Sequence, residues 1–304
     1  MNDKFGRKIN YARISLIDRC NLSCVYCEES NLQHDKIYIN DDLTFENYKF
    51  IIKGLSDIGI TKIEFLGGEP LLYPNLKELI NFTYEECNIA NISINTNGIG
   101  LATIARELRG YGLNEVNIRL DSLKEYKYKT ISGNGELKYV LDSIMTCVKL
   151  GIKVKVDCIP INRFNDDELL DFIALITNYP IEVRFIELIP INRLKDLYES
   201  GYFNLKEFIE EIKEIYRINN PQDSIGEYYT FNGARGKISI INPLRDYSCS
   251  RCNIVEITSS GTVKLCSLSE EEKDIRFYLD KPMIFREILK EIIMEKPERF
   301  YLNY

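Results

Sequence analysis

Three cysteines stand close together in the stretch RCNLSCVYC, residues 19–27, directly after a run, YARISLI, that is typical of a strand. Thiolates at such spacing are ligands for zinc or for an iron–sulfur cluster. Structural zinc takes four protein ligands, and no nearby cysteine or histidine completes a set with Cys20, Cys24 and Cys27. Three thiolates on a cluster leave one iron open to another molecule. The spacing therefore favours an iron–sulfur cluster with one open iron over zinc.

A second group of cysteines lies towards the other end of the chain, in CSRCNIVEITSSGTVKLC. Cys249, Cys252 and Cys266 follow a CxxCx13C spacing, which by itself is typical of three quarters of a zinc ribbon. The other three cysteines fall within helix or strand patterns and are predicted to be core residues, with Cys158 kept as an alternative ligand of the second group. They are Cys87, Cys147 and Cys158.

The composition limits what else the chain does. With 304 residues, 45% hydrophobic and 28% charged, it suits one large α/β domain or a large domain with a smaller appendage. A net charge of −7 and an isoelectric point of about 5.1 argue against a general binder of nucleic acid or of an anionic membrane. No apolar run reaches roughly 18 residues, and MNDKFGRKIN lacks the hydrophobic core of a signal peptide, so we expect a cytoplasmic protein.

Short β-branched runs alternate with amphipathic stretches through the first two thirds of the chain. The stretches predict helices, most clearly at 44–59, 101–112 and 135–151. Six alternations favour parallel strands with right-handed crossovers, in an incomplete barrel or a doubly wound sheet. The predicted strands are 11–17, 61–68, 91–97, 114–120, 152–159 and 181–188.

The pattern changes from about Phe203. A helix is predicted over 205–218, and short strands and turns that carry the second cysteine group follow it. The acidic run at 269–274 is predicted to be a solvated turn before the last helix. We therefore divide the chain into a barrel region, 1–202, and a smaller α+β region, 203–304, that closes over it.

The first cysteine loop resembles the signature of the radical S-adenosylmethionine (SAM) superfamily, CxxxCxxC with an aromatic residue before the last cysteine. A GGEP sequence after the second predicted strand matches as well. The resemblance implies a partial TIM barrel, (β/α)6, and a [4Fe–4S] cluster whose open iron binds SAM. Reductive cleavage of SAM would give a 5′-deoxyadenosyl radical that abstracts hydrogen from the substrate. The positions that the resemblance assigns to SAM are Tyr26, Gly67, Gly68, Glu69, Pro70, Arg119 and Ile189.

After a radical SAM barrel, the second cysteine group looks like the auxiliary-cluster region called a Twitch domain. This resemblance implies a second [4Fe–4S] cluster on Cys249, Cys252 and Cys266. Its open iron would bind the substrate, unless Asn253 or Asp246 fills that position. A cluster without a substrate contact would instead accept an electron from the product radical.

Nearly the whole chain is similar to the GTP 3′,8-cyclases of molybdenum-cofactor biosynthesis, through segments such as NTNG, LDSL, EVRFIELIP and GARGKISIINP. In that family the nucleotide contacts lie in the barrel lumen, towards which alternate strand residues point. Arg13, Lys155 and Arg184 keep a cation at positions where cyclases hold the nucleotide. The predicted substrate residues are Arg13, Glu64, Asn95, Lys155, Asp157, Arg184, Ile254 and Glu256.

Other lumen positions depart from the cyclase pattern. Glu64 and Asn95 replace nucleotide contacts, and CNIVEIT replaces CNRLRLT, so Ile254 and Glu256 stand where two arginines reach GTP. The chain ends in RFYLNY instead of a paired-glycine tail. A triphosphate carries about four negative charges, and unpaired like charges in a partly desolvated pocket cost several kcal/mol. We therefore expect a substrate other than GTP, either a small zwitterionic molecule or a peptide.

Two further interpretations stay open. One is an ordinary GTP 3′,8-cyclase whose missing cations are supplied by Arg235, Lys237 or Arg251. The other is a non-catalytic iron–sulfur or zinc scaffold that has kept the fold. For an enzyme, the resemblance implies a reductant such as flavodoxin or ferredoxin as a partner. No catalytic acid or base is assigned, and the candidates by position are Tyr26, Tyr73 and Asp157.

Overall fold

The computed structural model describes residues 1–27, 43–190, 194–220, 225–246, 249–267, 269 and 271–299. Strands and helices alternate along its first part, and all six predicted strands are confirmed. The predicted helices at 44–59, 101–112 and 135–151 are confirmed as α1, α3 and α5. The elements are β1 (Tyr11–Ser15), α1 (Phe45–Asp57), β2 (Lys62–Leu66), α2 (Leu76–Glu85), β3 (Asn91–Thr96), α3 (Leu101–Gly110), β4 (Glu115–Arg119), α4 (Glu125–Ser132), α5 (Leu137–Lys149), β5 (Lys153–Cys158), α6 (Leu169–Asn178) and β6 (Glu182–Ile186).

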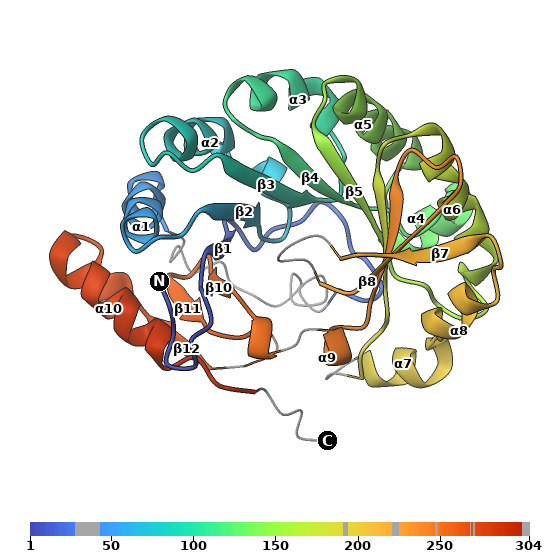
Figure 1. Cartoon of the computed structure of the whole chain (residues 1–304). Helices are drawn as coiled ribbons and strands as arrows, with labels where there is room; N and C mark the ends of the chain where they lie inside the picture. Colours follow the sequence, from blue (N-terminus) through green and yellow to red (C-terminus); the bar gives the residue numbers. More distant parts are fainter. Residues whose placement is uncertain are drawn as a thin grey trace.

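The six strands β1 to β6 are parallel, lie side by side in chain order and curve into a partial TIM barrel with α1 to α6 around the outside (Figure 1). This confirms the α/β fold and decides against a doubly wound sheet. Successive strand residues point to opposite faces, so each strand presents one apolar and one polar row. The apolar row packs under the helices, where Phe65 of β2 and Phe185 of β6 are fully buried, as is Phe172 of α6. The polar row faces the lumen.

Residues 194–299 supply further helices and six more strands. They are α7 (Lys195–Gly201), α8 (Leu205–Glu210), β7 (Ile215–Ile218), β8 (Glu227–Phe231), β9 (Lys237–Ile241), α9 (Pro243–Asp246), β10 (Ile254–Ile257), β11 (Thr262–Lys264), β12 (Glu272–Asp274) and α10 (Pro282–Met294). These strands belong to the same sheet as the barrel. β9 pairs in parallel with β6, and β10 pairs in parallel with β1, so both edges of the six-stranded barrel are extended.

Two predictions for this part are wrong in detail. The helix expected over 205–218 ends at Glu210, and the segment IYRI forms β7, which pairs antiparallel with β8. The β-branched and aromatic residues of IYRI favour a strand. Pairing with β8 stabilises this strand, and it outweighs the helical spacing of the sequence. Within the acidic run, residues 272–274 form β12 against β11 instead of a turn, although their side chains are exposed as expected.

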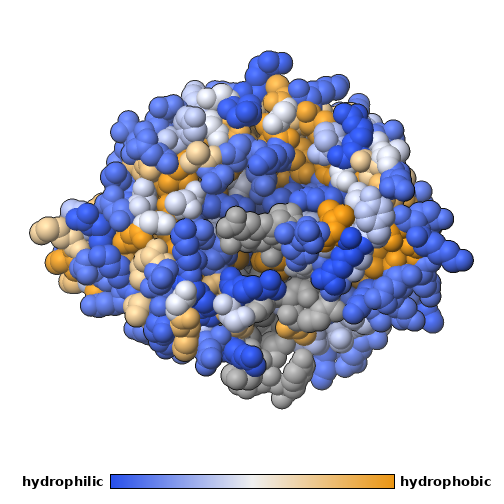
Figure 2. Space-filling model, in the orientation of Figure 1, coloured by the Kyte–Doolittle hydropathy of each residue, from blue (hydrophilic) through white to orange (hydrophobic). Residues whose placement is uncertain are grey.

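The last helix, α10, packs against the first, α1. Phe285 of α10 lies against Gly54 of α1, where a Cβ atom would come within 2.5 Å of the Phe285 ring, and its ring centroid is 5.0 Å from that of Phe50. Arg286 also approaches Asp57 at 3.4 Å. The face shown in Figure 2 is largely hydrophilic, with apolar areas near its top, at its right and at its left edge. The area at the left edge lies over α10, where Met283 is 75% exposed. No helix among the described residues is long and apolar enough to cross a membrane.

The strand directions place the two cysteine groups at opposite ends of the lumen. Cys20, Cys24 and Cys27 follow the carboxyl end of β1. Cys249 and Cys252 precede β10, which runs parallel to β1, and Cys266 follows β11, which runs back antiparallel to β10. Strands of five residues are roughly 16 Å long. The lumen therefore lies between the two groups, with its charged residues along the path.

Candidate active site

The first cysteine group occupies the loop after β1. None of the three cysteines forms a disulfide and all are half-buried, and the Cys27 amide donates to the Cys24 carbonyl at 3.0 Å. The Leu22 amide donates to the Cys20 sulfur at 3.4 Å. Burial raises the pKa of Cys24 to about 12. Among the described residues, no three Cys, His, Asp or Glu side chains already converge as a metal-ion site.

The two glycines of GGEP hold this loop in place. Gly67 has a φ of +146°, and a Cβ there would come within 2.3 Å of the Ile17 carbonyl oxygen. Gly68 donates its amide to the same carbonyl at 2.7 Å, and its own Cβ would lie 2.3 Å from the Arg19 carbonyl oxygen. Only glycine allows the end of β2 to approach the residues before Cys20 so closely. The structure therefore gives these glycines a packing role next to the cysteine loop.

Glu69 joins the ends of β2 and β3. Its carboxylate is buried and accepts from the Thr96 hydroxyl at 2.7 Å, the Asn97 amide at 2.8 Å and the Leu71 amide at 3.0 Å. Burial raises the pKa of Glu69, and these donors oppose the rise. Pro70 is buried at the start of the short 3-10 helix Pro70–Leu72. Asn97 extends the connection, because its side chain donates to Asn21 in the cysteine loop at 2.7 Å.

Tyr26 is attached to the end of β4. Its hydroxyl donates to the buried carboxylate of Asp121, which also accepts from the Ile159 amide at 2.7 Å. The Arg119 guanidinium lies over the Tyr26 ring, 5.6 Å from its centroid, and its Nη1 is 3.9 Å from Asp121. Among the described residues no hydrogen-bond acceptor meets this buried Nη1. A donor held in this way suits a carboxylate of SAM or of a substrate.

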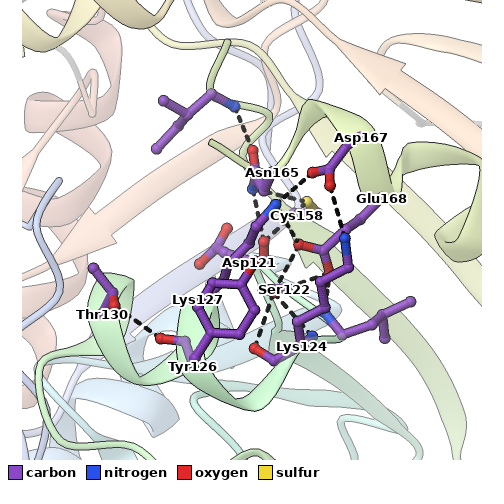
Figure 3. Close-up of polar contacts among 12 residues, drawn as sticks. Asp121, Ser122, Lys124, Tyr126, Lys127, Thr130, Cys158, Asn165, Asp167 and Glu168 are labelled. Carbon is purple, nitrogen blue, oxygen red and sulfur yellow. Dashed lines mark hydrogen bonds and ion pairs between the residues drawn. The ribbon is translucent and has the colours of Figure 1, made fainter. Parts of the chain in front are cut away.

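A buried network of hydrogen bonds around Asn165 and Glu168 holds the segment of Asp121 in place, as Figure 3 shows. Asn165 donates to the Asp121 carbonyl at 2.7 Å. Glu168, fully buried, accepts from the Ser122 hydroxyl at 2.9 Å and from the Leu123 amide at 2.7 Å. Lys127 approaches the same carboxylate at 3.3 Å. Sequence reasoning did not single out these residues, although the LDSL segment to which Asp121 belongs was part of the resemblance.

In the lumen, Arg13 of β1 is clamped between two carboxylates. Its Nε lies 2.9 Å from Glu64 on β2, and its Nη1 lies 2.6 Å from Glu256 on β10. Asn117 of β4 also donates to Glu64, and Ser267 donates to Glu256 at 2.8 Å. Arg13, Glu64 and Glu256 are register partners across three adjacent strands. The sequence prediction that Arg13 and Glu64 share one face is therefore confirmed, and the structure adds Glu256 to that face and pairs both carboxylates with Arg13.

The other predicted lumen cations are paired too. Arg184 forms two hydrogen bonds with Asp157, of 2.5 and 2.6 Å. Lys155 lies 2.9 Å from Glu115, which Lys62 also approaches at 3.4 Å. Burial opposes ionisation of Glu115, but the two lysines lower its pKa to about 2. Glu115 was missed from sequence, although it shares the lumen-facing parity of Asn117 and Arg119.

The remaining predicted residues are placed as follows. Asn95 is half-buried on β3 in register with Asn117, whose buried side-chain oxygen has no hydrogen-bond donor among the described residues. Ile189 is half-buried after β6, and Ile254 is buried at the start of β10. Cys87, Cys147 and Cys158 are buried in the core, as predicted.

The second cysteine group is held by backbone contacts. Cys249 begins the 3-10 helix Cys249–Arg251, and its carbonyl accepts from the Cys252 amide at 3.4 Å. The Cys266 carbonyl accepts from the Ser269 amide at 3.0 Å. Asn253, one candidate for a fourth ligand, donates its side-chain amide to Asn10 at 2.8 Å. The side chain of Asp246, the other candidate, lies outside the described residues.

These residues fit the two groups that the sequence implies. Each set of three thiols is without disulfides, and the first lies beside Arg119, whose buried Nη1 has no hydrogen-bond partner among the described residues. The partial barrel and this donor set together define a radical SAM enzyme. Residues 14–176 match the radical SAM superfamily, and residues 181–302 match the family described as Molybdenum Cofactor Synthesis C.

Two curated relatives span nearly the whole chain. The GTP 3′,8-cyclase of Clostridium botulinum (strain Langeland) is 39% identical over 302 residues, covering 98% of this chain and 93% of the relative. That of Clostridium acetobutylicum is 38% identical, covering 100% and 95%. The chain belongs to the GTP 3′,8-cyclase family, whose members use two [4Fe–4S] clusters and SAM.

A solved structure supports the fold alone. Streptococcus suis SuiB bound to S-adenosylmethionine has a TM-score of 0.65 at 14% identity. The match covers 96% of this chain and 66% of that one.

Proposed function

We propose that this chain catalyses the reaction for which its relatives are named, the 3′,8-cyclisation of GTP, in the lumen between its two cysteine groups. Full-length identity of 39% to a GTP 3′,8-cyclase carries this proposal. It reverses the preference drawn from sequence, which was for a substrate other than GTP. The placement of three cysteines without disulfides at each end of a polar lumen is consistent with it.

In this proposal Cys20, Cys24 and Cys27 hold the first cluster, and Cys249, Cys252 and Cys266 hold the second. Bound SAM and a reduced first cluster would supply hydrogen-atom abstraction at a substrate carbon. The protein's part is to bind and orient. Arg119 would receive a carboxylate of SAM, while Glu69 and Asp121 fix the cysteine loop against the ends of β3 and β4. An electron donor such as flavodoxin or ferredoxin would reduce the cluster.

A triphosphate in the lumen needs cations, and the sequence offers three candidates, Arg235, Lys237 and Arg251. Lys237, the first residue of β9, is 3.1 Å from Glu182, and Arg235, two residues before β9, donates to the Asn178 carbonyl at 2.9 Å. Arg251 is exposed in the turn between Cys249 and Cys252. Of the three candidates, only Arg251 lies at the second cysteine group. A GTP cyclase built on this chain would therefore depend on Arg251 together with a rearrangement of Arg13.

A second candidate substrate, a small zwitterionic molecule or a peptide, is favoured by the Arg13 clamp. Glu64 and Glu256 already neutralise Arg13, and each like-charge contact of a phosphate with a carboxylate at 4 Å costs about 4 kcal/mol near a protein surface. The unpaired oxygen of Asn117, beside Glu64, would accept an N–H or O–H of a substrate. An amine or hydroxyl group of a substrate therefore suits Glu64, Glu256 and Asn117 better than a triphosphate does.

Anaerobic reconstitution with iron and sulfide, followed by reduction in the presence of SAM, separates the candidates. The cyclase proposal predicts about eight irons per chain, 5′-deoxyadenosine formation that GTP accelerates, and a cyclised nucleotide. A chain that forms 5′-deoxyadenosine but neither binds GTP at micromolar concentration nor converts it would contradict the cyclase and leave the second candidate. Zinc in place of iron, with no SAM cleavage, would contradict both and support a scaffold.

An arginine variant sharpens the same test. I254R/E256R installs the two cations that the cyclase pattern has at these positions. If charge in the lumen decides the substrate, the variant should bind GTP at least tenfold more tightly than the unmodified chain. K264R/K290R, which changes exposed or half-exposed lysines without altering charge, is the matched control.

A further inference from the structure

Lys296 is a buried lysine whose ammonium donates to backbone carbonyls. It follows α10, and only 3% of the residue is exposed. Its ammonium donates to the Ile254 carbonyl at 2.8 Å and to the Leu265 carbonyl. Among the described residues no carboxylate forms an ion pair with it. A buried ammonium that meets only neutral acceptors is destabilising unless a negative charge lies nearby.

The two carbonyls belong to the segments that carry the second cysteine group. Ile254 comes two residues after Cys252 and begins β10, and Leu265 directly precedes Cys266 after β11. Because β10 and β11 pair antiparallel, both carbonyls lie at the same end of the hairpin. One ammonium therefore connects the backbone beside Cys252 to the backbone beside Cys266.

Arg7 makes the corresponding contact to Cys249, the remaining cysteine of the second group. Its side chain is buried, pairs with Asp3 at 2.6 Å and donates to the Cys249 carbonyl at 2.5 Å. Its Nη2 donates to the carbonyl of Pro297, the residue after Lys296, at 2.8 Å. The segments at residues 3–7 and 296–298 thus meet at the second cysteine group, from the two ends of the chain.

We infer that Lys296 is a positioning residue for the second [4Fe–4S] cluster: its ammonium offsets the negative charge of the cluster and, with Arg7, fixes the backbone on which the three cysteines stand. A cluster with three thiolates carries net negative charge, because the thiolates outweigh the charge of the oxidised core, and reduction makes it more negative. A buried cation beside it stabilises the bound cluster, and the reduced form most of all. The inference rests on the proposal that Cys249, Cys252 and Cys266 hold this cluster.

The packing of α10 against α1 holds Lys296 at this position. Phe285 packs against Gly54, and the Lys296 amide donates to the Ile293 carbonyl at 3.1 Å as the helix ends. The ammonium is therefore held beside Leu265 by the docking of α10 on α1. This arrangement uses a fixed charge close to the cysteines, whereas a flexible surface lysine would be screened by water.

The test compares K296Q, which keeps a hydrogen-bond donor but no charge, with K296R, which keeps the charge. K290Q, in the exposed pair with Glu287 on the same helix, is the control. All are reconstituted in a C20A/C24A/C27A chain, so that the remaining iron belongs to the second group. We expect K296Q to hold at most half of the iron that the parent and K296R hold, and its residual cluster to have a more negative midpoint potential by electron paramagnetic resonance.

Unfolding of the iron-free chains tests whether the role is merely structural. Without a cluster the buried charge is uncompensated, so iron-free K296Q should unfold at the same temperature as the parent or higher. An iron-free K296Q chain that unfolds earlier or fails to fold would overturn the inference, as would one that binds iron with unchanged potential. If C249A/C252A/C266A holds as much iron as the unmodified chain, the cluster assignment itself fails and the inference fails with it.

Discussion

The guanidinium of Arg184 and the carboxylate of Asp157 are register partners on adjacent strands, joined by two hydrogen bonds of 2.5 and 2.6 Å. The sequence predicts that Arg184 binds an anionic group of the substrate. Its two bonds to Asp157 show that the lumen is built from matched pairs, so an anion that enters must compete with a fixed carboxylate.

Replacing Asp157 should therefore destabilise the protein and release a cation. D157N removes one partner of a pair whose side chains are 17% and 4% exposed, which should lower the free energy of unfolding by about 3 kcal/mol. The double variant D157N/R184Q should recover part of this loss. Chemical denaturation of the iron-free chains measures both. E287Q, in an exposed pair, should change stability by less than about 0.5 kcal/mol, and an equal loss there would contradict the explanation.

Glu115 predicts a pH dependence of stability. Its folded-state pKa is about 2 against an ordinary value of 4.5, so the carboxylate stabilises the fold above about 4.5 and this contribution is lost as the pH falls towards 2. At pH 7 the stabilisation is at most about 3 kcal/mol. E115Q should be less stable than the parent at pH 7, with the gap closing in acid. A gap that stays constant from pH 7 to the acid limit would show that the lysines do not act through the Glu115 charge.

Tyr26 predicts a defect confined to the first cysteine group. Y26F removes the hydroxyl that donates to Asp121 and loosens the loop beside Cys24 and Cys27. Losing a partner that orients ligands commonly costs 10- to 100-fold in metal affinity or activity, so we expect about a 10-fold drop in 5′-deoxyadenosine formation. In a C20A/C24A/C27A background the remaining iron belongs to the second cysteine group, so Y26F should not change the iron content there. Y139F, at an exposed tyrosine on α5, should behave like the parent.

Gly67 predicts a steric defect at the same loop. In G67A the new Cβ would meet the Ile17 carbonyl oxygen at 2.3 Å, at a φ that side chains rarely adopt. We expect loss of the first cluster and at least about 2 kcal/mol of stability. G110A is the matched control, because nothing lies within 4 Å of a Cβ at that helical position, and it should stabilise the chain by about 0.5 kcal/mol. Iron content and thermal unfolding report both effects, and a G67A chain with a full first cluster would refute the packing role.

Sequence reasoning performed best where one periodicity decides the outcome. β-branched runs and strand parity predicted β1 to β6 and the shared face of Arg13 and Glu64. It failed at 215–218, where helical spacing and β propensity coincide and only the partner β8 decides.

Contacts between distant segments left no local signal in the sequence. The pairing of Lys155 with Glu115 and the position of Lys296 beside Leu265 depend on how strands and helices far apart in the chain are packed. The clamp on Arg13 likewise appears only when β1, β2 and β10 lie side by side. The same carboxylates that looked like free substrate contacts in the sequence are partners of a cation in the fold.

The strands β9 and β10 limit where the chain can be cut. They pair with β6 and β1, so the region after residue 202 covers both open margins of the barrel. A fragment ending at residue 202 would expose two rows of unsatisfied backbone amides and carbonyls and would be prone to self-association. The two halves are thus not interchangeable modules, and a graft onto another radical SAM barrel would have to match its outer strands in length and twist.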